Sequence, residues 1–159
     1  MRKTILSVTA ALALTACAST STTHVSRNQI IINTSAAPAC GSAGATRVAS
    51  QMAAVETLRN GFERFVIQGA GQSNNVSVIN RPPTGAYTTG TFNTFGNTTY
   101  GTARTTYTGG GPMVVGQHGA NLLVLMLNPG DAGFSEGVDA KRVLGDDWEK
   151  LVERGIRTC

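Results

Sequence analysis

The sequence predicts an α+β protein: a small, antiparallel-leaning sheet with helices packed on one face. Three observations predict this class, namely an amphipathic stretch at 43–60, short β-prone runs beside it, and a near-continuous apolar run at 121–128. The chain of 159 residues has room for one core. Its 41% apolar and 14% charged residues exclude a collagen-like, a coiled-coil and a wholly disordered protein.

The N-terminus is typical of an export signal. Arg2 and Lys3 precede an uncharged run, residues 5–16. As a helix this run would span about 18 Å, well short of the ~30 Å hydrocarbon core of a bilayer. Residues 1–16 therefore predict a signal peptide rather than a membrane span.

The end of this run, Leu14-Thr15-Ala16-Cys17, resembles the lipobox of bacterial lipoproteins. The resemblance implies that the Cys17 thiol carries a diacylglycerol as a thioether, that a peptidase cuts before Cys17, and that the freed amine is acylated, for example with palmitate. Two or three such chains would hold the protein on a membrane essentially permanently. The alternative is an ordinary signal peptide cut after Ala16. By resemblance to enterobacterial sorting, Ala18 in place of Asp favours the outer membrane, facing the periplasm.

The remaining elements follow from local pattern. Residues 17–28 are Ser/Thr-rich and predict a lipidated Cys followed by a flexible tether, after which a single α+β domain would occupy residues 29–159. Residues 29–33 predict a short strand. Ser42 would cap a helix at 43–60, with Gly61 as the C′ residue that follows it. Strands are expected at 62–68, 76–80 and 121–128, and helical segments at 138–144 and from Asp146, where Glu149 would complete a capping box.

The cysteines of the exported chain predict one disulfide. Besides Cys17 only Cys40 and Cys159 remain, and an even pair in an oxidising compartment favours a bridge. Such a bridge would hold the C-terminus across most of the domain. The alternative is a thiol pair with redox or metal-binding chemistry, although no Cys-x-x-Cys occurs and no His lies near either residue in sequence.

Residues 81–119 form a compositionally distinct insertion. The stretch is rich in Thr and Gly and lacks Asp and Glu, which predicts irregular β-hairpins or a mobile arm. Exposed rings on a β-surface can stack on sugars, and open strand edges can accept another chain. The possible interaction surface consists of five aromatic residues: Tyr87, Phe92, Phe95, Tyr100 and Tyr107.

No catalytic, cofactor-binding or metal site is predicted. Gly69-Ala70-Gly71 follows an expected strand but lacks the third glycine and the helix that a dinucleotide loop needs. His118 has no acidic neighbour in sequence, so a hydrolase built on it would need partners from elsewhere in the fold. Removal of Arg2 and Lys3 leaves eleven basic and nine acidic residues with no basic cluster, which gives no support for nucleic-acid binding.

The whole chain is similar to the small envelope lipoproteins of Gram-negative bacteria in its plan: lipobox, Ser/Thr segment, helix, Gly/Thr-rich middle and C-terminal helix. The resemblance implies a lipid-anchored envelope protein and brings no activity with it. The leading hypothesis is therefore a non-enzymatic protein that presents its domain for interaction with an outer-membrane protein, another periplasmic protein or a second copy of itself. The alternative is a glycan-binding module that links the outer membrane to peptidoglycan.

Overall fold

The computed structural model describes residues 17–159, so the signal-peptide prediction for residues 1–16 lies outside the described residues. The chain divides into two compact units. The main unit consists of residues 17–74 and 117–159, and the hairpin unit is Asn75–Gly116. Strands pair antiparallel in both units, and helices occur in the main unit, which confirms the α+β class.

The main unit is built on a five-stranded antiparallel sheet with the order β1-β2-β8-β3-β9. Its central strand, β8, is the apolar run recognised in the sequence, and it pairs with β2 on one side and β3 on the other. Burial nevertheless alternates along this run: Leu122, Val124 and Met126 are buried, whereas Leu123 and Leu125 are half-buried. The strands are β1 (Ala18–Ser26), β2 (Gln29–Ala36), β3 (Arg64–Asn74), β8 (His118–Leu127) and β9 (Val138–Asp139).

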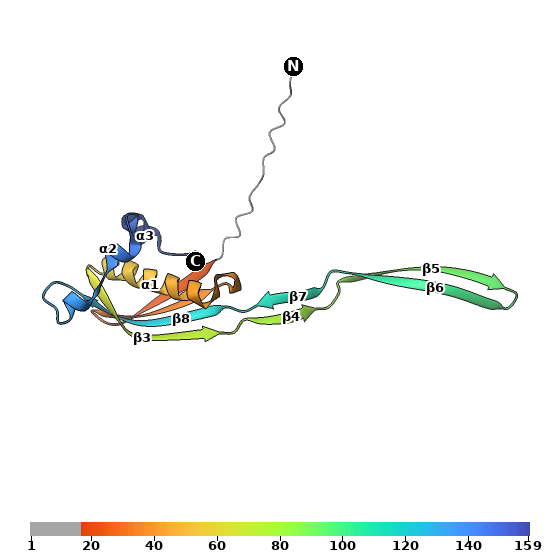
Figure 1. Ribbon diagram of the computed structural model, residues 1–159, viewed down its shortest axis with the longest axis horizontal. Helices are drawn as coiled ribbons and strands as arrows, with labels where there is room; N and C mark the ends of the chain where they lie inside the picture. Colours follow the sequence, from red (N-terminus) through yellow and green to blue (C-terminus); the bar gives the residue numbers. More distant parts are fainter. Residues whose placement is uncertain (1–16) are drawn as a thin grey trace, which may run out of the picture. The chain divides into compact units, whose positions relative to one another are not determined.

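The long helix α1 (Gly41–Arg59) packs against β2, β3 and β8, and it also contacts the two short C-terminal helices (Figure 1). These are α2 (Ala140–Leu144) and α3 (Trp148–Arg154). Arg59 joins α1 to α3, because its Nε donates to the Val152 carbonyl at 2.7 Å and its Nη2 to the Glu153 carbonyl at 3.2 Å. Short 3₁₀ turns precede α1 at Pro38–Cys40 and β9 at Phe134–Glu136.

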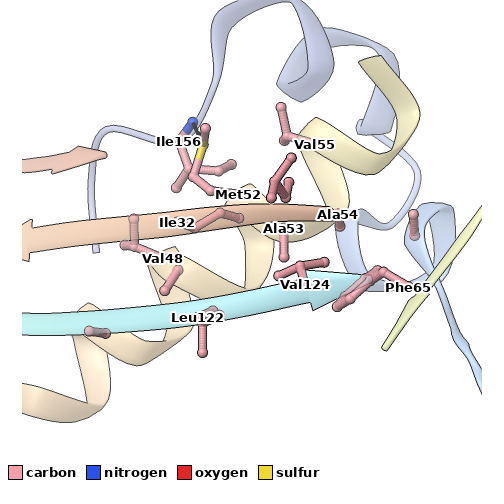
Figure 2. Packing of buried hydrophobic residues seen from close by; sticks show 14 of the residues in the cluster. Ile32, Val48, Met52, Ala53, Ala54, Val55, Phe65, Leu122, Val124 and Ile156 are labelled. Carbon is pink, nitrogen blue, oxygen red and sulfur yellow. Dashed lines mark hydrogen bonds between the residues drawn. The ribbon is translucent and has the colours of Figure 1, made fainter. Parts of the chain in front are cut away.

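The core lies between α1 and the sheet (Figure 2). Alternation in β2 places Ile30 and Ile32 in the core, fully buried, whereas Ile31 is half-buried. The helix contributes the predicted apolar face and several alanines, which let its backbone approach the strands closely. The largest fully buried side chains are Phe65, Ile30, Ile32, Met126, Val48, Val55, Val124, Thr34 and Thr57.

The prediction of a flexible tether at residues 17–28 is wrong. Ala18–Ser26 form β1, which pairs with β2 over its length, with a bulge between His24 and Ser26. The Thr20 hydroxyl lies 3.1 Å from that of buried Thr34. The Ser/Thr-rich composition led to the wrong prediction, because Thr is also favoured in strands and such a segment can pair with the edge of a neighbouring strand. The domain therefore begins at Ala18, not at residue 29.

Two of the predicted helix caps are also wrong. Residue 42 lies inside α1, whose N-cap is Cys40 without a side-chain hydrogen bond. The α3 helix begins after Asp147, again without a side-chain cap. The capping carboxylate is instead Asp139, whose Oδ1 accepts from the Arg142 amide at 3.0 Å at the start of α2. The Gly41 amide already donates to the Pro38 carbonyl of the preceding 3₁₀ turn, so the first amide of α1 has a partner without the serine hydroxyl.

The hairpin unit consists of two consecutive two-stranded antiparallel ribbons. The first pairs β4 (Ser77–Arg81) with β7 (Gly111–Val115), and the second pairs β5 (Gly85–Phe95) with β6 (Thr98–Thr108). The structure has paired β-strands in the insertion, as the β-hairpin alternative predicted. Its limits are 75–116 rather than 81–119, and it forms a compact unit of its own, so the expected single domain is two units.

Within residues 17–159, no helix combines the length and apolar character that crossing a bilayer would require.

Candidate functional site

The aromatic residues of the hairpin unit all lie in the β5–β6 ribbon, and all are exposed. The exposed fractions of their side chains run from 67% to 78%. The predicted residues are Tyr87, Phe92 and Phe95 in β5, and Tyr100 and Tyr107 in β6. Apart from half-buried Gly85, every residue of the ribbon is exposed, so the rings cover no core of their own.

The five rings do not form one surface. Side chains of directly opposed residues share a face, and successive residues alternate between faces. The pairs Tyr87–Thr106, Asn93–Tyr100 and Phe95–Thr98 therefore place three rings on one face. The pairs Ala86–Tyr107 and Phe92–Gly101 place the other two rings on the opposite face. The sequence pattern could not reveal this, because it depends on the register across the turn.

Phe92 fills the space that two glycines leave. A side-chain carbon added to Gly101 would lie 2.1 Å from the Phe92 ring, and one added to Gly90 would lie 3.1 Å from it. The ring thus lies across both strands on the face that it shares with Tyr107. Covering a strand glycine with a cross-strand ring restores packing that glycine lacks, so Phe92 is a structural residue of the ribbon.

Threonine pairs tie the ribbon together at three levels. Hydroxyl contacts join Thr88 to Thr105 at 2.8 Å, Thr94 to Thr99 at 3.0 Å, and Thr91 to Thr102 at 3.3 Å. Each such pair contributes only about 0.2–1 kcal/mol. The one charged residue of this ribbon is Arg104 in β6, and β5 has none. The ribbon is therefore a nearly uncharged surface whose own contacts stabilise it weakly.

The predicted disulfide between Cys40 and Cys159 is confirmed. The two Cα atoms lie 5.8 Å apart and the residues are 119 positions apart in sequence. Cys40 is partly buried against the core at the start of α1. The bridge therefore fixes the C-terminal residue to the end of the helix that covers the sheet.

Gly44 lies directly beneath this disulfide. A side-chain carbon added there would lie 2.9 Å from the Cys40 Cβ and 3.2 Å from the Cys159 Cβ. Alanine normally stabilises a helix interior relative to glycine by about 0.5–1 kcal/mol. At this position the helix thus contains glycine because the bridge leaves no room for a larger residue.

We expect Gly44→Ala to lower the free energy of unfolding by about 1–2 kcal/mol, because overpacking against two fixed Cβ atoms exceeds the gain in helix propensity. Urea unfolding of the oxidised protein measures the loss. The same substitution in reduced protein should cost less, since the Cys159 Cβ is then free to move. An equal loss in both states would contradict the role of the bridge.

Cys17 lies at the start of β1, beside the C-terminal segment. It forms an isolated antiparallel bridge with Thr158. The next residue, Ala18, donates its amide to the Arg157 carbonyl at 2.8 Å, and the Cys17 carbonyl accepts from the Ala37 amide at 3.2 Å. Cys17 is exposed. The predicted lipidation residue is therefore held against a segment that the disulfide fixes.

His118 begins β8, opposite Ala36 in β2 and Asn74 in β3. Its Nδ1 is buried, and no hydrogen-bond partner for this atom occurs among residues 17–159. The acid that a hydrolase would require at this nitrogen is therefore not brought to it. In the same part of the chain, no group of three His, Cys, Asp or Glu residues could hold a metal ion.

Sequence reasoning missed a polar hollow between the loops of the main unit. Its lining includes Asn28, Asn60 and Asn128, each at the end of an element, together with Asp131. Some of these polar groups already have hydrogen-bond partners. The Asp131 Oδ2 accepts from the Asn128 amide at 2.7 Å, and the Asn60 Nδ2 donates to the Glu56 carbonyl at 2.8 Å. These groups close turns, which is the usual role of Asn and Asp at such positions.

Comparison of the chain with protein-family models, curated proteins and solved structures finds no match.

Proposed function

We propose that the chain is a lipid-anchored envelope protein, attached through Cys17, that presents the hairpin unit to a protein partner and has no catalytic function. The proposal places it in the outer membrane facing the periplasm. The observation that carries the interaction role is the β5–β6 ribbon: eleven-residue strands, almost uncharged, exposed throughout and rich in aromatic residues. Natural proteins rarely leave such strands open without a partner.

The position of β1 supports the anchor. This strand begins at Ala18, so the cysteine that the lipobox predicts to be lipidated lies directly next to a strand of the sheet. The carbonyl of Cys17 itself takes part in the fold. A lipid on this residue would hold the domain directly at the bilayer surface, because no tether separates them.

The same proposal includes the arrangement of the helices on a single face of the five-stranded sheet. Alternation of burial supports it, because Ile30 and Ile32 are fully buried whereas Ile31 is half-buried. Register places Ile31 opposite Leu123, which is also half-buried. The second face of the sheet would then carry no helix.

Cys17→Ser tests the anchor. Because the serine hydroxyl cannot form the thioether, we expect the variant to lose incorporation of radiolabelled palmitate and to move from the membrane pellet to the soluble envelope fraction. Ser21→Ala, a change on an exposed position of the same strand, should leave both unchanged. A variant that stays in the membrane pellet with undiminished label would refute lipid attachment through Cys17.

Photo-crosslinking from position 100 tests the interaction role. A photoreactive residue in place of Tyr100, in the full-length anchored protein, should give a discrete adduct identified by mass spectrometry. The same residue at Glu149, an exposed position on α3, serves as the control surface. Adducts from position 149 alone would place the contact on the main unit and contradict the proposal.

The exposed rings favour peptidoglycan as a second candidate partner. Purified peptidoglycan should then co-sediment the protein, and joint replacement of Tyr87 and Tyr100 by Ala should abolish this. Register weakens this candidate, since six residues, about 20 Å, separate the two rings along their shared face. Adjacent sugars stack on rings much closer together than this.

A further inference from the structure

We propose that the partner of β5 is β5 of a second copy of the chain, joined edge to edge and antiparallel about a two-fold axis at Gly90. This inference rests on the proposed function, because it names the partner of the hairpin unit. The ribbons of two copies would then form one four-stranded sheet in the order β6-β5-β5-β6. This pairing depends on which backbone N–H and C=O groups of β5 are not bonded to β6, and on which residues would lie opposite each other in the two copies.

The turn determines which groups are open. Gly96 and Asn97 form a two-residue loop with a positive φ at Gly96 only, so Phe95 and Thr98 flank the loop as an opposed, hydrogen-bonded pair. Hydrogen-bonded pairs recur at every second residue along an antiparallel ladder. The alternate residues of β5 direct their N–H and C=O groups away from β6. These residues are Ala86, Thr88, Gly90, Phe92 and Thr94.

This outward set is symmetric about Gly90. A second β5 laid antiparallel pairs 86 with 94, 88 with 92, and 90 with itself, so every outward residue meets an outward residue of the other copy. An isologous interface needs this self-complementarity. A different register would leave outward groups at the ends of the strand without partners.

The side chains suit the same register. Phe95 would lie opposite Gly85, where glycine leaves room for the ring, and Tyr87 would lie opposite Asn93. At the centre the two glycines meet, and the Phe92 ring already covers its own Gly90 from one face. No like charges oppose each other, because β5 contains no charged residue and no proline.

Two other strand edges, those of β6 and β1, have features that oppose pairing and that β5 lacks. The β6 edge carries Arg104 next to its midpoint, so self-pairing there would bring two guanidinium groups together on one face. The β1 edge is interrupted by a bulge, and the Ala18 amide is occupied by the Arg157 carbonyl. Arg104 on the outer strands would also stop the four-stranded sheet from adding further copies.

Energetics favour the same conclusion. A two-stranded ribbon without a core is marginally stable in water, whereas three or more strands can be stable. In the described part of the chain, only β6 pairs with β5. Anchoring on one membrane surface would raise the local concentration of the second copy.

Cysteine cross-linking in the envelope tests the register. Two differently tagged full-length copies are co-expressed, one with Thr89→Cys and the other with Thr91→Cys, positions that the proposal places opposite each other about 4.5 Å apart at Cα. We expect a disulfide-linked heterodimer at least tenfold more abundant than either homodimer. Copies with Ala103→Cys, at the midpoint of β6, should give no dimer.

A matched pair of charge variants supplies the second readout. Thr91 and Thr102 are cross-strand partners on one face and share a single hydroxyl contact, but only Thr91 lies in β5. Thr91→Lys should reduce co-purification of two tagged copies from solubilised membranes at least tenfold, and Thr102→Lys should leave it near the unsubstituted level. Equal losses in both variants would overturn pairing through β5.

The outcomes also separate this inference from the proposed function. If the cysteines at 89 and 91 are reactive towards maleimide yet form no heterodimer, self-pairing is refuted. The proposed function then stands if the Tyr100 probe captures a different, identified protein. If the chain is not membrane-bound and the Tyr100 probe gives no adduct while the heterodimer still forms, the proposed function fails and the self-pairing remains.

Discussion

Joint replacement of Cys40 and Cys159 by Ala is expected to lower the free energy of unfolding by about 4–5 kcal/mol. The reason is the length of the closed loop: with 119 positions between the cysteines, the bridge removes much of the entropy of the unfolded chain. Reversible urea unfolding of the oxidised protein and of the double variant measures the difference. This is a large fraction of the stability of an ordinary small domain.

The same substitution has a local consequence at the N-terminus. Without the bridge, the C-terminal segment keeps its pairing with Cys17 and Ala18 and the buried Ile156 side chain. The Ile156 amide also donates to the Met52 sulfur at 3.2 Å. Hydrogen exchange at the Ala18 amide, whose acceptor is the Arg157 carbonyl, should therefore accelerate more than exchange in β8. Cys17→Ser serves as the control, because it removes a thiol but leaves the bridge intact. A loss below about 1 kcal/mol would contradict the chain-entropy argument.

The sequence allowed prediction of those parts of the fold where a pattern had a single physical interpretation. The helix at 43–60 was predictable because its apolar residues follow helical spacing and Gly61 comes after it, and the strand at 121–128 because it is a near-continuous apolar run. The tether failed because a Ser/Thr run is compatible with a linker and with an edge strand, and only β2 decides between them. The disulfide was predictable from the compartment that the lipobox implied, together with the count of remaining cysteines.

The candidate surface was predictable only as a list of residues. Tyr87 and Tyr107 stand out in the sequence as exposed rings in a Thr/Gly context, and both are exposed. Their placement on opposite faces depends on a two-residue turn at Gly96, which sequence periodicity did not locate. The open backbone edge of β5 carries no sequence signal of its own, because every strand has N–H and C=O groups. The edge of β5 is distinguished because the strand contains no charged residue and no proline, and because no third strand pairs with it among the described residues.

Phe65→Ala is expected to lower the free energy of unfolding of the main unit by about 3–5 kcal/mol. Phe65 is among the largest fully buried side chains and lies in β3 opposite Met126 in β8 and Val138 in β9. Figure 2 shows its ring in the cluster with Val124 and Ala54. Truncation would leave a cavity that the strands on either side cannot fill without shifting their register, so most of the transfer and packing energy is lost.

Phe92→Ala is the matched control, because it removes the same ring from a site that is 70% exposed. Its effect on unfolding of the main unit should stay within about 0.5 kcal/mol, since it deletes no buried contact there. Phe65→Leu should fall between the two, because it retains part of the buried volume. If Phe65→Ala and Phe92→Ala shifted the urea midpoint equally, the core would not depend on β3 as described. Equal shifts would mean that the free energy of unfolding depends as much on the hairpin unit as on the core. The strands β5 and β6 bury almost no side chains, so that result is not expected.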